Sequence, residues 1–306
     1  ELCQCIEDWR VLIQIMHKAP VSVRQLVIRP PCFIGYSDAC RLGAGGVWCS
    51  GTHTLEPFLW AVEWPQDIQD ALITDSNPGG SITINELELA GALLSLLALE
   101  TWEVPLLYAH LAWFGDNITS VAWAYRLRNS RSRVAGFLLR FIGLRLHKLG
   151  ASNLIPHHIA GEENVMADFI SRAFKNGIYF KHAPNGLVPY FNTTFPLQSG
   201  SWTECRLPTA LVSSVIACLR GELLPMASLL RRMPLGKNTG ATGSSTQPVP
   251  DLTLSSAQPS LPSSATLSQE HLLLGSGQVA TDLDIESRLA VSRTHCQPSP
   301  RPSSWL

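Results

Sequence analysis

Apolar and polar positions alternate along the chain in a pattern that predicts a sheet covered by helices. Short runs rich in aromatic and β-branched residues are typical of strands, and longer stretches with apolar residues at helical spacing are typical of helices. The predicted strands are 32–39, 46–50, 58–64, 107–114 and 153–158. The predicted helices of the same region are 85–102, 118–128, 133–149 and 162–174. This order predicts an α/β fold in which helices flank both faces of a five-stranded mixed sheet.

The pattern divides the chain into four regions. Residues 1–31 are predicted to be largely helical, and residues 32–176 form the α/β domain. Residues 177–235 have a mixed pattern that predicts a partly helical spacer. Residues 236–306 are rich in Ser, Thr, Pro and Gly with few aromatics, a composition typical of a disordered tail.

Composition favours an intracellular location and argues against a zinc site and a membrane partner. The eight cysteines include no Cys-x-x-Cys pair, so we expect no zinc site and interpret them as reduced thiols of an intracellular protein, cytoplasmic or nuclear. The apolar stretch 89–99 is shorter than the roughly 20 residues of a membrane span, so we expect no membrane partner. The chain begins with Glu1 rather than Met, and we expect it to be a piece of a longer product.

Four acidic residues stand in apolar surroundings, where a carboxylate needs a compensating partner. Asp38 ends the first predicted strand, Asp116 ends the fourth, Glu88 lies in the first long helix of the domain, and Asp168 lies in the last. Each also has an ordinary explanation. Asp38 could cap a turn, and Asp116 could be a helix N-cap. Glu88 could be a first-turn Glu favoured by the helix dipole, and Asp168 could lie on a solvated helix face.

Taken together, the four acids predict one site. A parallel pairing of the first and fourth strands would place Asp38 beside Asp116, and the long helix would bring Glu88 to them. Glu88 is preferred over Glu86 because it begins a stripe of small residues that lets the helix lie close to the sheet. That stripe consists of Glu88, Gly91, Ala92 and Ser95. Carboxylates in this number suit two Mg²⁺ or Mn²⁺ ions, which hydrolyse phosphodiesters in pairs.

Four motifs contain these acids in a fixed order. They are Y-S-D-A at 36–39, I-N-E-L-E-L at 84–89, G-D-N at 115–117 and H-I-A-G-E-E-N-V-M-A-D-F-I-S-R at 158–172. Over about residues 32–174 the series closely resembles the ribonuclease H domain of LTR-type and tyrosine-recombinase retrotransposon polyproteins. The last motif matches that family's H-x-x-G-x-x-N-x-x-A-D-x-x-S-R signature and is the most specific of the four.

The resemblance implies a ribonuclease H fold and cleavage of the RNA strand of RNA–DNA hybrids. It implies that the four acids are catalytic residues that bind two Mg²⁺ or Mn²⁺ ions. It also implies a reverse transcriptase domain upstream in the same polyprotein, with residues 1–31 as a remnant of its thumb or connection. Asn85 matches a position that contacts the hybrid's minor groove in cellular enzymes, and we assign Asn117 to the substrate as well.

Two histidines depart from the family pattern. Cellular enzymes carry a histidine in a mobile loop ahead of the last helix, whereas His157 and His158 fall in the fifth predicted strand. We therefore interpret each as an ordinary strand residue.

Basic residues are concentrated between Asn117 and Gly161, a stretch without a single acidic residue. A cluster at the junction of two predicted helices is suited to phosphate contacts, and the alternative is a solubilising face. The cluster consists of Arg126, Arg128, Arg131 and Arg133. A hybrid duplex would be recognised by its backbone shape and 2′-hydroxyls rather than by its base sequence.

The sequence thus predicts a metal-dependent retroelement ribonuclease H. One alternative is a non-catalytic descendant, a nucleic-acid-binding or structural remnant of a decayed element. Another is a different nuclease or an integrase on the same fold, because a fold does not determine one function.

Overall fold

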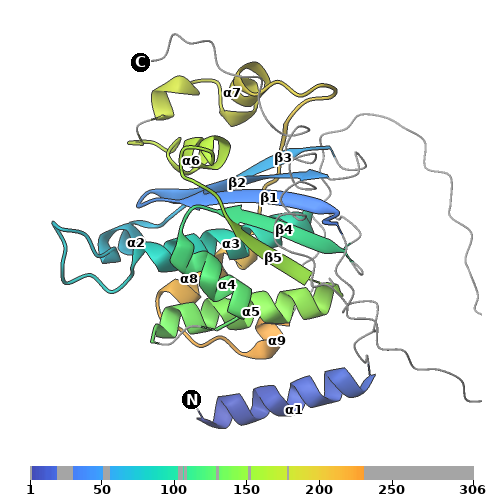
Figure 1. Ribbon diagram of the computed structural model, residues 1–306. Coiled ribbons are helices and arrows are strands. Elements are labelled where there is room, and N and C mark those ends of the chain that lie inside the picture. The colour runs from blue at the N-terminus through green and yellow to red at the C-terminus, as the bar shows by residue number, and fades with distance from the viewer. Residues whose placement is uncertain are drawn as a thin grey trace, which may run out of the picture. The chain divides into compact units, whose positions relative to one another are not determined.

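A mixed sheet of strand order β5-β4-β1-β2-β3-β6 lies at the centre of the structure (Figure 1). The computed structural model describes residues 2–18, 30–50, 56–102, 106, 109–128, 131–150, 153–177 and 179–230. The expected disordered tail, 236–306, lies outside these described residues. The described part of the chain belongs to one compact unit.

The first three strands form an antiparallel meander, and the next two extend it in parallel on the β1 side. The strands are β1 (Phe33–Ala39), β2 (Gly43–Ser50), β3 (Phe58–Glu63), β4 (His110–Gly115), β5 (Asn153–His158) and β6 (Thr203–Glu204). All five predicted strands are present, and the predicted parallel pairing of the first and fourth is confirmed. The fold class is therefore the expected one, an α/β fold with a mixed sheet flanked by helices.

Helices cover both faces of the sheet (Figure 1). On one face lie α6 (Val165–Ser171) and α7 (Leu187–Thr194), joined by a short 3-10 turn η2 (Phe180–His182). On the other lie α2 (Gln66–Ala71), α3 (Ile84–Thr101), α4 (Ile118–Arg126), α5 (Arg133–Leu149), α8 (Thr209–Leu219) and α9 (Met226–Leu230). The long helix α3 packs against β1 and β2 on one side and against α5 and α8 on the other. This double packing explains why α3 is apolar around nearly its whole circumference.

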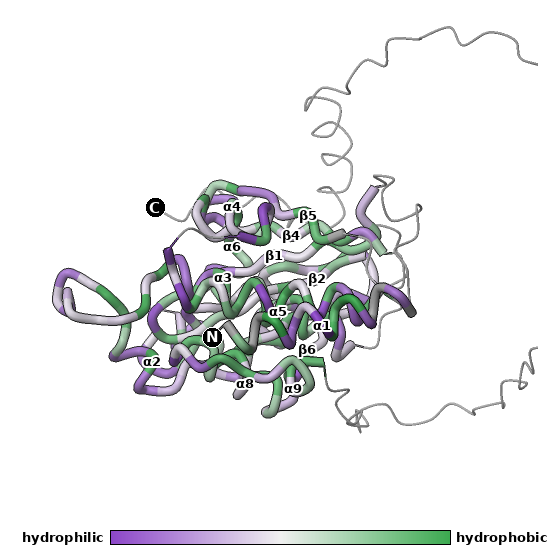
Figure 2. The backbone as a smooth tube through the Cα atoms, turned by 90° about the horizontal axis from the view of Figure 1, so that it is seen from below, coloured by the Kyte–Doolittle hydropathy of each residue, from purple (hydrophilic) through white to green (hydrophobic). Residues whose placement is uncertain are grey.

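The N-terminal helix α1 (Leu2–Lys18) is present as predicted and contacts α5. Asp8 of α1 receives two hydrogen bonds from the Arg140 guanidinium, at 2.6 and 2.9 Å, and the same guanidinium donates to the Leu224 carbonyl oxygen at 2.7 Å. Figure 2 shows α1 beside α5, with hydrophilic and hydrophobic positions interleaved along both. None of the described helices combines the length and the apolarity that crossing a membrane requires.

The segment predicted as a spacer contributes to both sides of the sheet. The two-residue strand β6 pairs with β3, so the sheet has six strands rather than the predicted five. A second apolar cluster, here called the α6-side core, joins α6 and the sheet to later aromatic residues. It contains Val47, Cys49, Leu59, Phe169, Ile170, Phe191, Phe195 and Trp202. Residues 187–202 therefore help to hold α6 on the sheet.

We predict that a chain ending after residue 176 will not fold cooperatively, whereas a chain ending after residue 230 will. The shorter chain lacks three buried aromatics of the α6-side core, Phe191, Phe195 and Trp202. Burial of such side chains contributes about 1.5–3 kcal/mol each, comparable in sum with the stability of a whole domain. Thermal unfolding followed by circular dichroism would check this. Equal midpoints for the two chains would contradict it.

Candidate active site

Three carboxylates from three elements meet at one end of the central strands. Asp38 lies at the end of β1, Asp116 directly follows β4, and Glu88 lies in the second turn of α3. Each offers one carboxylate oxygen, and these three oxygens all lie within 4.8 Å of one another. Asp38 and Glu88 are buried, with 3% and 4% of their surface exposed, and Asp116 is half-buried. We call these three residues the carboxylate cluster.

Strand register and helix packing bring the carboxylate cluster together. In the parallel β1–β4 pair Tyr36 lies opposite Phe114, so the acids two residues further along each strand emerge at the same edge. Helix α3 crosses close to this edge. A Cβ at Gly91 would lie 3.7 Å from the Asp38 carbonyl oxygen and equally far from Ala39, which is ordinary van der Waals contact. The stripe of small residues thus faces β1, as the sequence predicted.

The neighbouring acid Glu86 has a different set of contacts. Its Oε2 accepts a hydrogen bond of 2.6 Å from the Thr83 backbone N–H in the capping box that begins α3. Its Oε1 accepts a hydrogen bond from the Ser132 hydroxyl at the start of α5. Glu88 Oε2, in contrast, is buried without any hydrogen-bond partner among the described residues. The sequence-based preference for Glu88 over Glu86 agrees with these contacts.

Burial and mutual repulsion make the carboxylate cluster hold protons more tightly than ordinary acids. Burial raises the pKa of Asp38 to about 6, and the charges of Asp116 and Asp168 add to the rise. Burial also raises the pKa of Glu88 well above its ordinary value, with Asp38 and Asp116 contributing. The pKa of Asp116 is raised chiefly by burial. An all-oxygen donor set with an unpartnered buried oxygen on Glu88 fits a hard divalent cation such as Mg²⁺.

Asp168 is placed beside the carboxylate cluster but not within it. Its charge raises the pKa of both Asp38 and Asp116, so the carboxylate lies close to them. Its Oδ1, however, lies 2.6 Å from the guanidinium of Arg172, the residue that follows α6. Of the four predicted metal ligands, the structure therefore brings three together and leaves the fourth paired with Arg172.

Hydrogen bonds between α6 and β1 hold these elements in register. Asn164 Nδ2 donates to the Ser37 carbonyl oxygen at 3.1 Å, and the Ser171 hydroxyl donates to Asp38 Oδ2. The Cys40 thiol donates to the Ser171 carbonyl oxygen at 3.0 Å. Asn164 and Ser171 were not assigned a role from the sequence. The signal that marks them is their fixed place in the signature motif at 158–172.

His158 lies at the exposed rim of the site. It ends β5, as predicted, and its Nε2 is 3.1 Å from the Asp116 backbone oxygen, where its charge opposes the rise in the pKa of Asp116. Its interpretation as an ordinary strand residue overlooked this contact, which arises because His158 pairs with Gly115 of the neighbouring strand. His157 stacks on Phe114 with ring centroids 4.9 Å apart, which is a packing role.

The predicted substrate residues lie along one side of α3 and at the α4–α5 junction. Asn117 Nδ2 donates to Asn85 Oδ1 at 2.8 Å, and Asn117 Oδ1 accepts from the Ser120 backbone N–H at 3.0 Å. Asn117 is therefore the N-cap of α4, which was the ordinary explanation weighed for the Asp-Asn pair, and it also orients Asn85. The predicted basic cluster is exposed at the junction of α4 and α5, and consists of Arg126, Arg128, Arg131 and Arg133.

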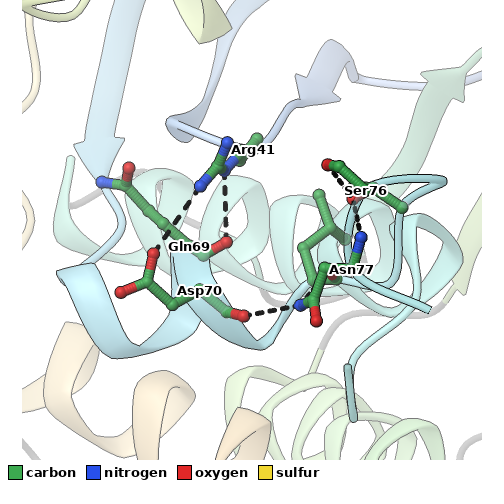
Figure 3. A pocket seen from close by; sticks show the side chains of 7 residues that line it. Arg41, Gln69, Asp70, Ser76 and Asn77 are labelled. Carbon is green, nitrogen blue, oxygen red and sulfur yellow. Dashed lines mark hydrogen bonds and ion pairs between the residues drawn. The ribbon is translucent and has the colours of Figure 1, made fainter. Parts of the chain in front are cut away.

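A separate polar pocket lies between the β1–β2 turn and the loop that follows α2 (Figure 3). It has a volume of about 300 Å³ and contains none of the four acids. Its lining consists of Arg41, Gln69, Asp70, Leu72, Thr74, Ser76 and Asn77. Several of these groups bond to one another, as in the 3.6 Å ion pair between Arg41 and Asp70 and the 2.8 Å hydrogen bond from Asn77 to the Asp70 carbonyl oxygen. The carboxylate cluster remains the candidate active site.

Comparisons with known proteins yielded one structural similarity. No model of a protein family matches the chain, and no curated protein matches it. Among solved structures it is similar to LC11-RNase H1, isolated from compost by a metagenomic approach, at 18% sequence identity and a TM-score of 0.35. The similarity covers 46% of this chain and 93% of that protein.

We predict that the metal-free protein loses stability as the pH rises through about 6. The folded-state pKa of Asp38 is raised from 3.8 to about 6, so its stabilising contribution is complete below 3.8 and is lost as the pH passes the folded value. For Asp38 the loss amounts to about 3 kcal/mol in the free energy of unfolding. Thermal unfolding in EDTA between about pH 3 and pH 7 measures it, because the loss occurs between the unfolded and the folded pKa of Asp38.

Asp38→Asn should flatten this pH dependence because an amide resembles the protonated acid. Asp70→Asn, at an exposed side chain, is the matched control and should leave the dependence unchanged. A midpoint of unfolding that rises with pH across this window in the parent protein would contradict the prediction.

Proposed function

We propose that this chain is a metal-dependent endonuclease that hydrolyses the RNA strand of RNA–DNA hybrids. The observation that carries the proposal is the carboxylate cluster, in which three acids share one buried edge of the sheet and their oxygens lie within 4.8 Å of one another. Like charges are gathered in this way where a cation compensates them. The signature motif at 158–172 and the ribonuclease H-like fold support this class of hydrolase over other phosphodiesterases.

The four acids would hold two Mg²⁺ or Mn²⁺ ions. Bound ions would activate water for in-line attack and stabilise the leaving oxygen of the phosphodiester. Asp38 and Asp116, at the ends of adjacent strands, would flank both ion positions. Glu88 would bind one ion through its unpartnered Oε2 and orient the attacking water. Asp168 would complete the second position after leaving Arg172.

The substrate side of the proposal rests on charge and on the asparagine pair. The basic cluster at the α4–α5 junction is exposed and suited to backbone phosphates, and Asn85 is oriented by Asn117. With Asn85 Oδ1 already accepting a hydrogen bond, its Nδ2 is a donor for an acceptor in the minor groove. Such contacts recognise the shape and 2′-hydroxyls of a hybrid rather than a base sequence.

We place this activity within a retroelement polyprotein, downstream of a reverse transcriptase domain. The support is the signature motif, whose polar members each have a partner in the site. Asn164 bonds to β1, Ser171 bonds to Asp38, and Arg172 pairs with Asp168. A reverse transcriptase produces RNA–DNA hybrids, and a ribonuclease H in the same polyprotein would remove their RNA strand.

We predict that the full chain cleaves the labelled RNA strand of a hybrid in the presence of Mg²⁺ or Mn²⁺, and that EDTA abolishes cleavage. Asp116→Asn should reduce the rate by more than about 100-fold, because even outer partners of metal ligands contribute about 10–100-fold. Asp70→Asn, an exposed acid outside the cluster, is the control. Hybrid binding without cleavage by the folded parent protein would instead favour the non-catalytic alternative.

We predict that the double substitution Arg126→Gln and Arg128→Gln raises KM for the hybrid while changing kcat little. Each lost phosphate contact should lower the slope of log Kd against log salt concentration by about one. Arg206→Gln, at an exposed position after β6, removes one charge away from the α4–α5 junction and serves as the control. An unchanged slope in the double variant would show that these arginines only solubilise the surface.

A further inference from the structure

The geometry points to Arg172 as a positioning residue that acts as an internal cation in the metal-free site. In this inference, which rests on the proposed function, its guanidinium takes the charge-compensating place of the second ion and holds Asp168 away from the carboxylate cluster. The second ion then binds only by displacing Arg172 from Asp168. The residue would thereby set the order in which the two ions bind and the concentration that the second one requires.

The contacts of Asp168 carry the first step. Its Oδ1 lies 2.6 Å from an Arg172 nitrogen, at the i,i+4 spacing where such pairs form on a helix surface. The oxygens of the carboxylate cluster converge within 4.8 Å without Asp168. Asp168 also faces the Tyr179 hydroxyl, whose pKa it helps to raise. The fourth acid is therefore engaged by a cationic side chain of the protein itself.

The charge of Arg172 also acts on the carboxylate cluster. Its positive charge opposes the raised pKa of Asp38 and also that of Asp116, so the guanidinium acts on two members of the carboxylate cluster as well as on Asp168. The Arg172 backbone is itself held, because its carbonyl oxygen accepts a hydrogen bond of 3.4 Å from the Tyr179 backbone N–H. Arg172 Nε is buried without a hydrogen-bond partner among the described residues. The Arg172 charge thus acts on three of the four acids.

These contacts predict an ordered loading of the site. The first ion meets three acids that already converge. The second must compete with an ion pair whose two side chains are 42% and 23% exposed. A pair of this exposure weakens binding of the second ion by up to about fivefold. A surface pair with no role at the site would leave ion binding unchanged, and a merely structural arginine would weaken binding when removed.

The test is calorimetric titration of the full chain with Mg²⁺, comparing the parent with Arg172→Gln. We expect the Kd of the second ion to fall by about two- to fivefold, and by more than the Kd of the first. Lys175→Gln is the matched control, because it removes one exposed positive charge three residues away. Arg172→Lys, which keeps the charge without the fork of donors, should give a smaller change in the same direction.

The outcomes separate the two proposals. A parent protein that binds two ions, with Arg172→Gln binding the second no more tightly than Lys175→Gln does, overturns the inference alone. A folded parent that binds no divalent ion overturns the proposed function and the inference with it. If Arg172→Gln does not fold, Arg172→Lys decides the matter, because unchanged or weaker binding of the second ion by that variant contradicts the inference.

Discussion

Repulsion between buried carboxylates is the constraint on which the rest of this structure depends. One carboxylate oxygen each of Asp38, Glu88 and Asp116 lies within 4.8 Å of the others, and burial, with the charges of neighbouring acids, raises the pKa of each. Three like charges this close together, two of them buried, are energetically unfavourable unless hydrogen bonds or cations compensate them. The protein supplies part of it with the Ser171 hydroxyl and the Arg172 guanidinium, and a pair of divalent ions would supply the remainder.

Helix α6 is the element through which this compensation reaches the sheet. Its N-cap Asn164 and its last residue Ser171 both donate to β1, and it carries Asp168, with Arg172 following as its C-cap. The close approach depends on a glycine at position 45, because a Cβ there would overlap Ile170. The α6-side core then covers the outer face of the helix with aromatics from residues 187–202. The segment beyond the predicted domain boundary thus supports the geometry of the acids.

The helix α3 connects the acids to the expected substrate side. Two residues before Glu88, Glu86 closes the capping box of α3 and accepts a hydrogen bond from Ser132, the residue that caps α5. This link fixes the α4–α5 junction, where the basic cluster lies, relative to the helix that carries Glu88. Asn85 and Asn117 form a second link on the same side. Glu86, which has a structural role, and Glu88, which belongs to the carboxylate cluster, therefore stand only two residues apart in the chain.

The sequence by itself determined the first five strands and the longer helices of the α/β domain, although not the short helix α2, and it predicted the three acids that converge. These follow from local periodicity and from motifs such as the small stripe that distinguishes Glu88 from Glu86. Only the tertiary structure decided that Asp168 pairs with Arg172, that His158 borders Asp116, and that a sixth strand joins the sheet. The reason is physical. A two-residue strand has no period to detect, and contacts between neighbouring strands or between a side chain and its rival partners depend on distances that no single segment contains.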